Sequence, residues 1–193
     1  TYIVQVSIIG LGRLGSCFAA SVANAGITVH GVDIDPAIRA AIRENRAPFP
    51  EPQLSDYIQS GAQHMTVSSD IADSINDSQV VFVFVNTYED DERGYALSQL
   101  NEVIADITHA LQSVKSPPLI VIRSTTMPGD IDGEISAKLT NISEHSNLDI
   151  CYWPELTALG QVIQTMEDPD FRLIGQNSVR AGDELEAFIQ RWR

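Results

Sequence analysis

A chain of 193 residues is long enough for one domain with a full hydrophobic core. Its formal net charge of −14 disfavours nucleic acid and anionic lipid surfaces, so we expect neither as a partner. No apolar run approaches the roughly 20 residues that a membrane-spanning helix needs, and no basic and apolar leader is visible, so we expect a cytoplasmic protein.

Strand-length apolar runs alternate with helix-like segments along the chain. The apolar runs predict strands near residues 3–10, 27–35, 64–69, 80–87, 118–126, 148–155 and 171–175. Helix-like segments between and after them include residues 13–25, 36–45, 97–114 and 178–192. This alternation predicts an α/β fold with a doubly wound, mostly parallel sheet that has helices on both faces.

Two stretches in the middle of the chain refine this prediction. The run VVFVFV, at residues 80–85, is apolar on both strand faces, as is typical of a central parallel strand. The stretch YEDDERG, at residues 88–94, is acidic, and we expect it to be a solvated loop. Nothing in the sequence marks a second domain, so we treat residues 1–193 as one domain.

Cysteine and histidine are too few and too scattered for a disulfide framework or a metal site. Cys17 and Cys151 lie far apart in the sequence, and we expect both to be reduced and buried. None of the four histidines belongs to an H-x-x-x-H pattern or lies within a group of acidic ligands. The sequence therefore predicts no metal site.

The first predicted strand runs into the glycine pattern G-x-G-x-x-G, and a helix-like segment follows. Gly10 permits a tight turn, Gly12 lets a pyrophosphate approach the backbone, and Gly15 lets the helix pack closely against the sheet. The phosphates would lie at the helix N-terminus, where free N–H groups favour negative charge. Arg13 and Leu14 belong to the same cofactor-binding loop, and Arg13 reaches either over the phosphates or into solvent.

Asp33 ends the second predicted strand and supports a dinucleotide site. It lies 18 positions after Gly15 (33 − 15), near the offset of about 20 for a ribose-binding carboxylate. A carboxylate there accepts hydrogen bonds from the ribose hydroxyls and repels a 2′-phosphate, which favours NAD over NADP. A glycine pattern alone also fits a simple tight turn, but the strand–helix–strand context favours the dinucleotide.

Four stretches, taken in order, resemble the nucleotide-sugar 6-dehydrogenases, the UDP-glucose and GDP-mannose dehydrogenase family. GLGRLGSCFA with GVDIDP resembles the family's NAD fingerprint, and NRAPFPEPQL resembles a stretch with Pro, Glu-Pro and Leu at these offsets. VIRSTTMPGD is similar to the K-S-T-V-P-P-G loop. WPELTALG and MEDPDFRLIG are similar to N-P-E-F-L-x-E-G and P-D-R-x-x-x-G. The resemblance covers essentially the whole chain.

The resemblance implies an oxidoreductase that converts a sugar C6 alcohol to a carboxylate in two hydride transfers to NAD, through a thioester on a cysteine. Nothing in this sequence matches the segment that holds that cysteine. The chain therefore resembles the N-terminal NAD-binding domain of a longer enzyme, and we expect it to be inactive alone. The implied partners are a nucleotide-sugar substrate, a C-terminal domain and, in the intact enzyme, further copies of the same protein.

The resemblance also implies roles for four side chains. Thr125 would help to hold a catalytic water, and Glu155 would assist thioester hydrolysis as a carboxylate that takes a proton from water. Thr87, which is expected at the end of the fourth core strand, and Ser124 would contact the cofactor. Each threonine hydroxyl is also compatible with a purely structural role at a strand end.

Some positions depart from the family pattern, mostly on the sugar side of the cleft. Arg123 replaces the loop lysine, and Leu159 replaces a second glutamate. Tyr88 replaces a proline, and Ile38 replaces a basic residue that is found here one position later, at Arg39. The cofactor side of the pattern is better kept.

Two other interpretations remain open. A β-hydroxyacid dehydrogenase-like domain that binds NAD(P) would share GLGRLG and a Ser-Thr-x-x-Pro turn, but such proteins usually carry a D-A-P-V-S-G-G-like stretch where this chain has WPELTALG. A non-catalytic NAD-binding module is favoured by Leu159 and opposed by Glu155 and Thr125.

Overall fold

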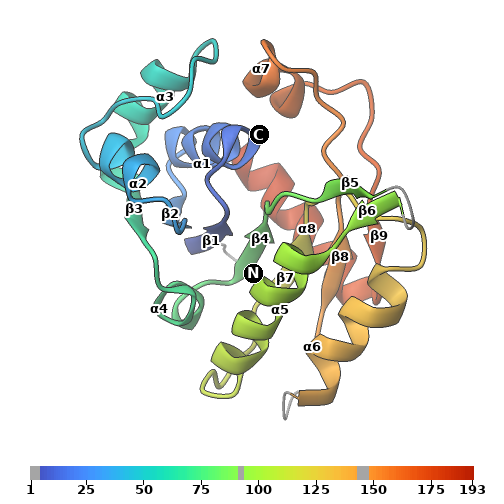
Figure 1. The fold of residues 1–193 in the computed structure, drawn as a ribbon. Coiled ribbons are helices and arrows are strands. Elements are labelled where there is room, and N and C mark those ends of the chain that lie inside the picture. The colour runs from blue at the N-terminus through green and yellow to red at the C-terminus, as the bar shows by residue number, and fades with distance from the viewer. Residues whose placement is uncertain (1–4, 91–93, 143–147) are drawn as a thin grey trace.

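The computed structural model describes residues 5–90, 94–142 and 148–193, which form one central sheet covered by helices on both faces (Figure 1). The strand order is β3-β2-β1-β4-β7-β8-β9. All neighbouring strands are parallel except the edge pair β8 and β9. The strands are β1 (Gln5–Ile9), β2 (Thr28–Val32), β3 (Met65–Ser68), β4 (Val80–Val83), β7 (Leu119–Ile122), β8 (Ile150–Tyr152) and β9 (Gly175–Gln176). The predicted doubly wound, mostly parallel α/β fold is confirmed.

The helices lie in two layers. One layer contains α1 (Arg13–Asn24), α3 (Leu54–Gly61), α7 (Val162–Glu167) and α8 (Val179–Trp192), and the other contains α4 (Ile71–Asn76), α5 (Ser98–Leu111) and α6 (Ser136–Ile142). Short elements complete the described chain: α2 (Pro36–Arg43), a 3₁₀ turn (Ala62–His64) and a π-helical turn (Ile131–Ile135). The four helix-like segments that the sequence indicated correspond to α1, α2, α5 and α8.

Two expectations about strands were wrong. Residues 171–175 were expected to form a strand, but β9 begins only at Gly175. Phe171 and Leu173 are instead exposed. The stretch 88–94 was expected to be a loop, but β5 (Tyr88–Asp90) pairs antiparallel with β6 (Gly94–Ala96), and its residues 91–93 lie outside the described part of the chain.

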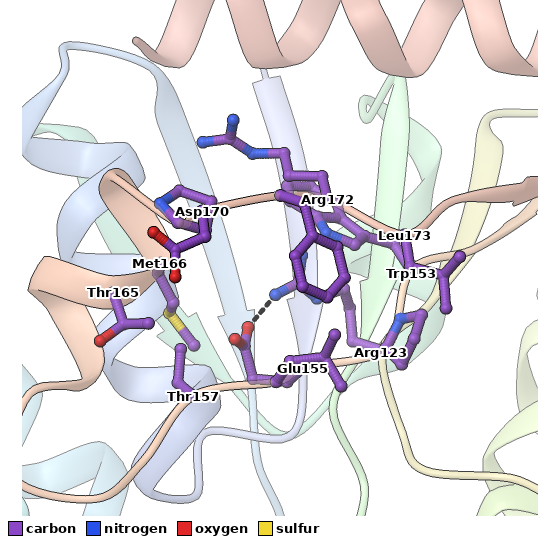
Figure 2. A pocket seen from close by; sticks show the side chains of 13 residues that line it. Arg123, Trp153, Glu155, Thr157, Thr165, Met166, Asp170, Arg172 and Leu173 are labelled. Atoms are coloured by element: carbon purple, nitrogen blue, oxygen red, sulfur yellow. Dashed lines mark hydrogen bonds and ion pairs between the residues drawn. The ribbon is translucent and has the colours of Figure 1, made fainter.

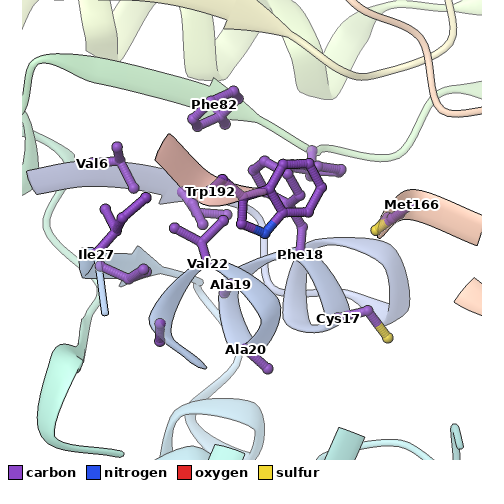
Figure 3. Packing of buried hydrophobic residues seen from close by; sticks show 14 of the residues in the cluster. Val6, Cys17, Phe18, Ala19, Ala20, Val22, Ile27, Phe82, Met166 and Trp192 are labelled. Carbon is purple, nitrogen blue, oxygen red and sulfur yellow. The ribbon is translucent and has the colours of Figure 1, made fainter. Parts of the chain in front are cut away.

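The sheet separates two hydrophobic clusters because its central strands are apolar on both faces. Along β7, Leu119 and Val121 face the cluster that contains α1 and α8, whereas Ile120 and Ile122 face the cluster that contains α5. Helix α1 lies at the centre of the first cluster, where Phe18 packs edge-on against Phe82 with 4.9 Å between ring centroids (Figure 3).

The C-terminal helix is fixed against α1 and α7 through polar contacts. Trp192 donates a hydrogen bond from Nε1 to Ser21 Oγ at 2.9 Å, and Ser21 donates to Glu167 Oε1 at 2.6 Å. Arg193 forms an ion pair with the same glutamate at 3.2 Å. Residues near the end of the described chain therefore help to hold α7 in place.

Candidate functional site

The glycine loop that follows β1 has the geometry expected of a dinucleotide-binding turn. Gly10 has φ +92°, and its N–H donates to Val32 O at 2.8 Å. A Cβ atom at Gly10 would lie 2.4 Å from Phe84 O, and one at Gly15 would lie 1.9 Å from Gly10 O. A Cβ atom at Gly12 would meet nothing within 4 Å. Two glycines are therefore required by the fold, and the third leaves open space beside the start of α1.

Asp33 lies directly beside this loop. Its Oδ2 accepts a hydrogen bond from the Leu11 N–H at 2.7 Å, and its Oδ1 accepts one from the Asp35 N–H at 2.8 Å. Arg39 donates to the carbonyl oxygen of Asp33 at 2.6 Å, so the basic residue that is displaced by one position still braces this turn. Each carboxylate oxygen keeps a second lone pair for a ribose hydroxyl.

Arg13, for which the sequence left open a direction over the phosphates or into solvent, turns back onto the protein. Its Nη1 donates to Pro50 O at 3.0 Å and lies 3.3 Å from Glu51 Oε2. The guanidinium also lies over the Phe49 ring, 5.8 Å from the centroid. Glu51 is buried, and its other oxygen accepts from the Val162 N–H at 3.2 Å. A phosphate contact of Arg13 stays a prediction.

The loops after β4 and β7 are joined by side-chain hydrogen bonds. Thr87 was expected at the end of the fourth core strand. Strand β4 ends at Val83, so Thr87 lies four residues beyond it, in the following loop. Thr87 donates to Thr125 O at 2.7 Å, and Ser124 Oγ accepts from the Val85 N–H at 3.1 Å. The Ser124 side chain is buried, whereas Thr125 is exposed. The cofactor and water-holding roles of these residues stay predictions.

Arg123 and Glu155 form an ion pair at the carboxyl ends of β7 and β8 (Figure 2). Arg123 is only 3% exposed, and its guanidinium lies 3.8 Å from the ring centroid of Trp153. The rings of Phe18 and Phe84 are each 5.0 Å away. Burial lowers the pKa of Arg123 to about 10, although Glu155 opposes this shift, so the guanidinium is charged at neutral pH.

A pocket of about 110 Å³ lies beside this pair, between segments 153–157 and 165–173. Glu155 and Arg123 both line it, and Figure 2 shows the ion pair between them. The exposed apolar side chains of Leu156, Phe171 and Leu173 also line it. Thr125 is not among the lining residues, so the structure brings only one of the two predicted catalytic residues to this pocket.

Sequence reasoning missed how Arg123 and Trp153 act together. Arg123 was treated only as a departure from a lysine, and Trp153 only as the first letter of WPELTALG. The available signal was a cation at the end of the apolar run LIVIR, which must be partnered when it is buried. The identity of the partner could not be read because Trp153 lies in another motif.

Both cysteines are free and buried, as predicted. Burial raises the pKa of Cys17 and of Cys151 to about 12, so neither thiol ionises near neutral pH. Over residues 5–90, 94–142 and 148–193, no group of three or more His, Cys, Asp or Glu side chains could hold a metal ion. No helix in the described ranges is long and apolar enough to cross a membrane.

The model of the UDP-glucose/GDP-mannose dehydrogenase family NAD-binding domain matches residues 4–193. The chain belongs to this family. Its sequence is similar to the GDP-mannose 6-dehydrogenase of Pseudomonas putida, with 26% identity over 192 residues, which is 97% of this chain and 44% of the relative. It is also similar to the UDP-glucose 6-dehydrogenase AglM of Haloferax volcanii, with 27% identity over 94% of this chain and 43% of the relative.

The structure is similar to that of a ternary complex of GDP-mannose dehydrogenase from Pseudomonas aeruginosa. The TM-score is 0.91 at 25% identity, over 96% of this chain and 44% of the other. A 3-hydroxyisobutyrate dehydrogenase from Salmonella typhimurium, at 19% identity and a TM-score of 0.64, shares the fold. The chain spans less than half the length of the curated relatives it matches. It is an NAD-binding domain of the nucleotide-sugar dehydrogenase family, and the β-hydroxyacid dehydrogenase interpretation is less well supported.

Proposed function

We propose that the protein carrying this chain is an NAD-dependent nucleotide-sugar 6-dehydrogenase, and that residues 1–193 are its NAD-binding domain. The observation that carries this proposal is the contact of Phe84 with both candidate sites. The Phe84 backbone crowds Gly10 in the glycine loop, and the Phe84 ring lies 5.0 Å from the Arg123 guanidinium that pairs with Glu155. A dinucleotide-binding turn and a candidate acid–base residue therefore share one edge of the sheet.

The residues present fit NAD. The open space at Gly12 and the free N–H groups at the start of α1 suit a pyrophosphate, and the carboxylate of Asp33 suits a ribose. Leu14 lies in the first turn of α1, while Ser124 and Thr87 join the neighbouring loops through hydrogen bonds. When bound, NAD supplies the hydride acceptor for the oxidation of an alcohol.

On the substrate side, Glu155 orients and deprotonates the water that hydrolyses a thioester, and Thr125 helps to hold that water. The cysteine that forms the thioester, and the remainder of the cleft, come from a C-terminal part that this chain lacks. The substrate is a nucleotide sugar, and the intact enzyme is a cytoplasmic homo-oligomer. A non-catalytic NAD-binding module is the second candidate, because Leu159 stands where the family pattern has a glutamate and its side chain is 68% exposed.

Two measurements test the proposal. Titration of the 193-residue chain with NAD and NADP should show at least about tenfold tighter binding of NAD, because a 2′-phosphate would face Asp33. The longer protein should form NADH with GDP-mannose or UDP-glucose, while the 193-residue chain should form none. Equal affinity for the two cofactors would contradict the NAD assignment. Absence of NADH formation by the longer protein with either sugar would favour the non-catalytic module.

A further inference from the structure

The positive charge of Arg123 lies in an unusual environment. The side chain is 2% exposed, and Glu155 is its ion-pair partner. The Nε and Nη1 atoms are buried and have no hydrogen-bond partner within the described residues. A buried charged group with incomplete hydrogen bonding is costly unless other favourable contacts replace water. Here those contacts are the faces of three aromatic rings.

The rings around the guanidinium are themselves held in place. Phe18 packs edge-on against Trp153, with 6.1 Å between centroids, and also against Trp192 at 5.1 Å. Trp153 also contacts Phe82, with 6.5 Å between ring centroids. The cage is therefore part of the hydrophobic cluster beneath α1, and it restricts the plane in which the guanidinium can lie.

Trp153 and Glu155 come from the same short segment after β8. The ring of Trp153 lies against the guanidinium at 3.8 Å, while Oε2 of Glu155 accepts from Nη2 of Arg123. Fixing the guanidinium plane thus fixes the direction in which the carboxylate is held. The ion pair uses Oε2, and Oε1 has no hydrogen bond from the described residues.

We propose that Arg123 is a positioning residue for Glu155, and that Trp153 is the surface that holds the Arg123 guanidinium in the required orientation. This inference rests on the proposed function, because it assigns Glu155 a water to orient. Arg123 acts through Glu155 and need not touch the substrate.

The inference explains why an arginine stands at this position. A planar guanidinium stacks on an aromatic face and presents its N–H groups in fixed directions, whereas a lysine ammonium is compact and strongly hydrated. The family pattern has lysine and asparagine where this chain has Arg123 and Trp153. A flat cation with a flat ring replaces a compact cation with an amide, so the two positions should be energetically coupled.

The test compares four variants of the longer protein: Arg123→Lys, Trp153→Asn, the double variant and Trp153→Phe. Arg123→Lys and Trp153→Asn should each lower kcat by about tenfold to a hundredfold without changing the KM for NAD, because Glu155 is misplaced while the glycine loop is untouched. The double variant should be less impaired than the sum of the single variants, and Trp153→Phe should retain most of the activity because a ring remains.

Arg172→Lys is the matched control. Arg172 lines the same pocket, but it donates to Glu167 O and, among the described residues, forms no hydrogen bond or ion pair with Glu155. The loss of kcat that Arg123→Lys or Trp153→Asn causes should be the same with and without Arg172→Lys. Additive losses in the double variant, or an unchanged kcat in Arg123→Lys, would overturn the proposal.

A second measurement separates this proposal from the proposed function. Carbon-13 relaxation of the Glu155 side chain in the 193-residue chain should show one ordered conformation that becomes mobile in Arg123→Lys and in Trp153→Asn. The Glu51 side chain should stay ordered in both variants. If the longer protein forms no NADH, the proposed function fails, and the order of Glu155 still decides the positioning role. An unchanged order of Glu155 would overturn it.

Discussion

The glycine loop and the Arg123–Glu155 pair lie at the same edge of the sheet, but they are built in different ways. The loop depends on backbone geometry, since Gly10 has φ +92° and a Cβ at Gly15 would collide with a carbonyl oxygen. The pair depends on side chains from distant parts of the chain that meet around one cation. Backbone constraints allow only glycine and so mark the sequence, whereas a cage of side chains permits several solutions.

The largest effect should come from the glycine loop, where replacement of glycine by alanine can be compared at Gly15 and at Gly12. Gly15→Ala puts a Cβ 1.9 Å from Gly10 O, so we expect destabilisation of about 3 kcal/mol or more and loss of NAD binding. Gly12→Ala meets no atom within 4 Å, so its stability should stay within about 1 kcal/mol of wild type while NAD affinity falls. Urea unfolding and NAD titration measure both, and equal stabilities of the two variants would contradict the geometry.

Removal of the charge on Glu155 should affect the other site. Glu155→Gln leaves the buried Arg123 without a counter-charge, and we expect a loss of about 3 kcal/mol in unfolding free energy with NAD affinity nearly unchanged. In the longer protein, turnover should fall about 10²–10⁴-fold, and a covalent substrate adduct should accumulate that intact mass spectrometry detects. Glu44→Gln is the control, since its ion pair with Arg46 is exposed and should contribute under about 1 kcal/mol. Full turnover without an adduct would make Glu155 a structural residue.

Cofactor preference should depend on Asp33 alone. Asp33→Asn removes the charge that disfavours a 2′-phosphate, so the preference for NAD over NADP should fall by about tenfold. Asp35→Ala, two positions away, should leave that preference unchanged. Because the Asp35 side chain accepts from the Ala37 N–H at the start of α2, its loss should cost about 1 kcal/mol of stability. A similar shift in preference in both variants would remove Asp33 from the ribose site.

The smallest effect concerns two buried thiols. Cys17 lies in α1, which follows the glycine loop, and Cys151 lies in β8, which leads to Glu155. Unfolded thiols ionise near pH 9, but both folded thiols keep their protons to about pH 12. Their contribution to stability is fully present below pH 9 and is lost as the pH rises further, because the unfolded state then binds fewer protons. The unfolding free energy should therefore decline between pH 9 and 10, and Cys17→Ala with Cys151→Ala should flatten that decline. An identical slope in the double variant would contradict it.

Most of the fold could be predicted because its signals are local. Strands that are apolar on both faces indicated a parallel sheet, and the glycine loop located α1 and β2. The predicted strand at 171–175 failed because Phe171 and Leu173 are apolar but face the pocket rather than the core. Apolar residues indicate burial only on average, and a pocket lining is the common exception.

Within the candidate site, only the local geometry of the glycine loop and its neighbouring carboxylate could be predicted. Gly10, Gly15 and Asp33 have the geometry that their spacing predicted. Two ion pairs could not be foreseen, that of Arg13 with Glu51 and that of Arg123 with Glu155. Each joins residues more than thirty positions apart, and their approach depends on the packing of α7 and β8. Neither pair can be recognised from a pattern within one short stretch of the sequence.

The division of the core by the sheet has a consequence for how this sequence can change. The cation cage and α1 belong to one cluster, whereas Ile104, Ile107 and Leu111 of α5 pack in the other. Side chains on opposite faces of a sheet share few partners, so substitutions beneath α5 should combine additively with those around Arg123. Residues beneath α5 can therefore be substituted, in evolution or in a redesign for greater thermal stability, while the opposite face of the sheet preserves the chemistry.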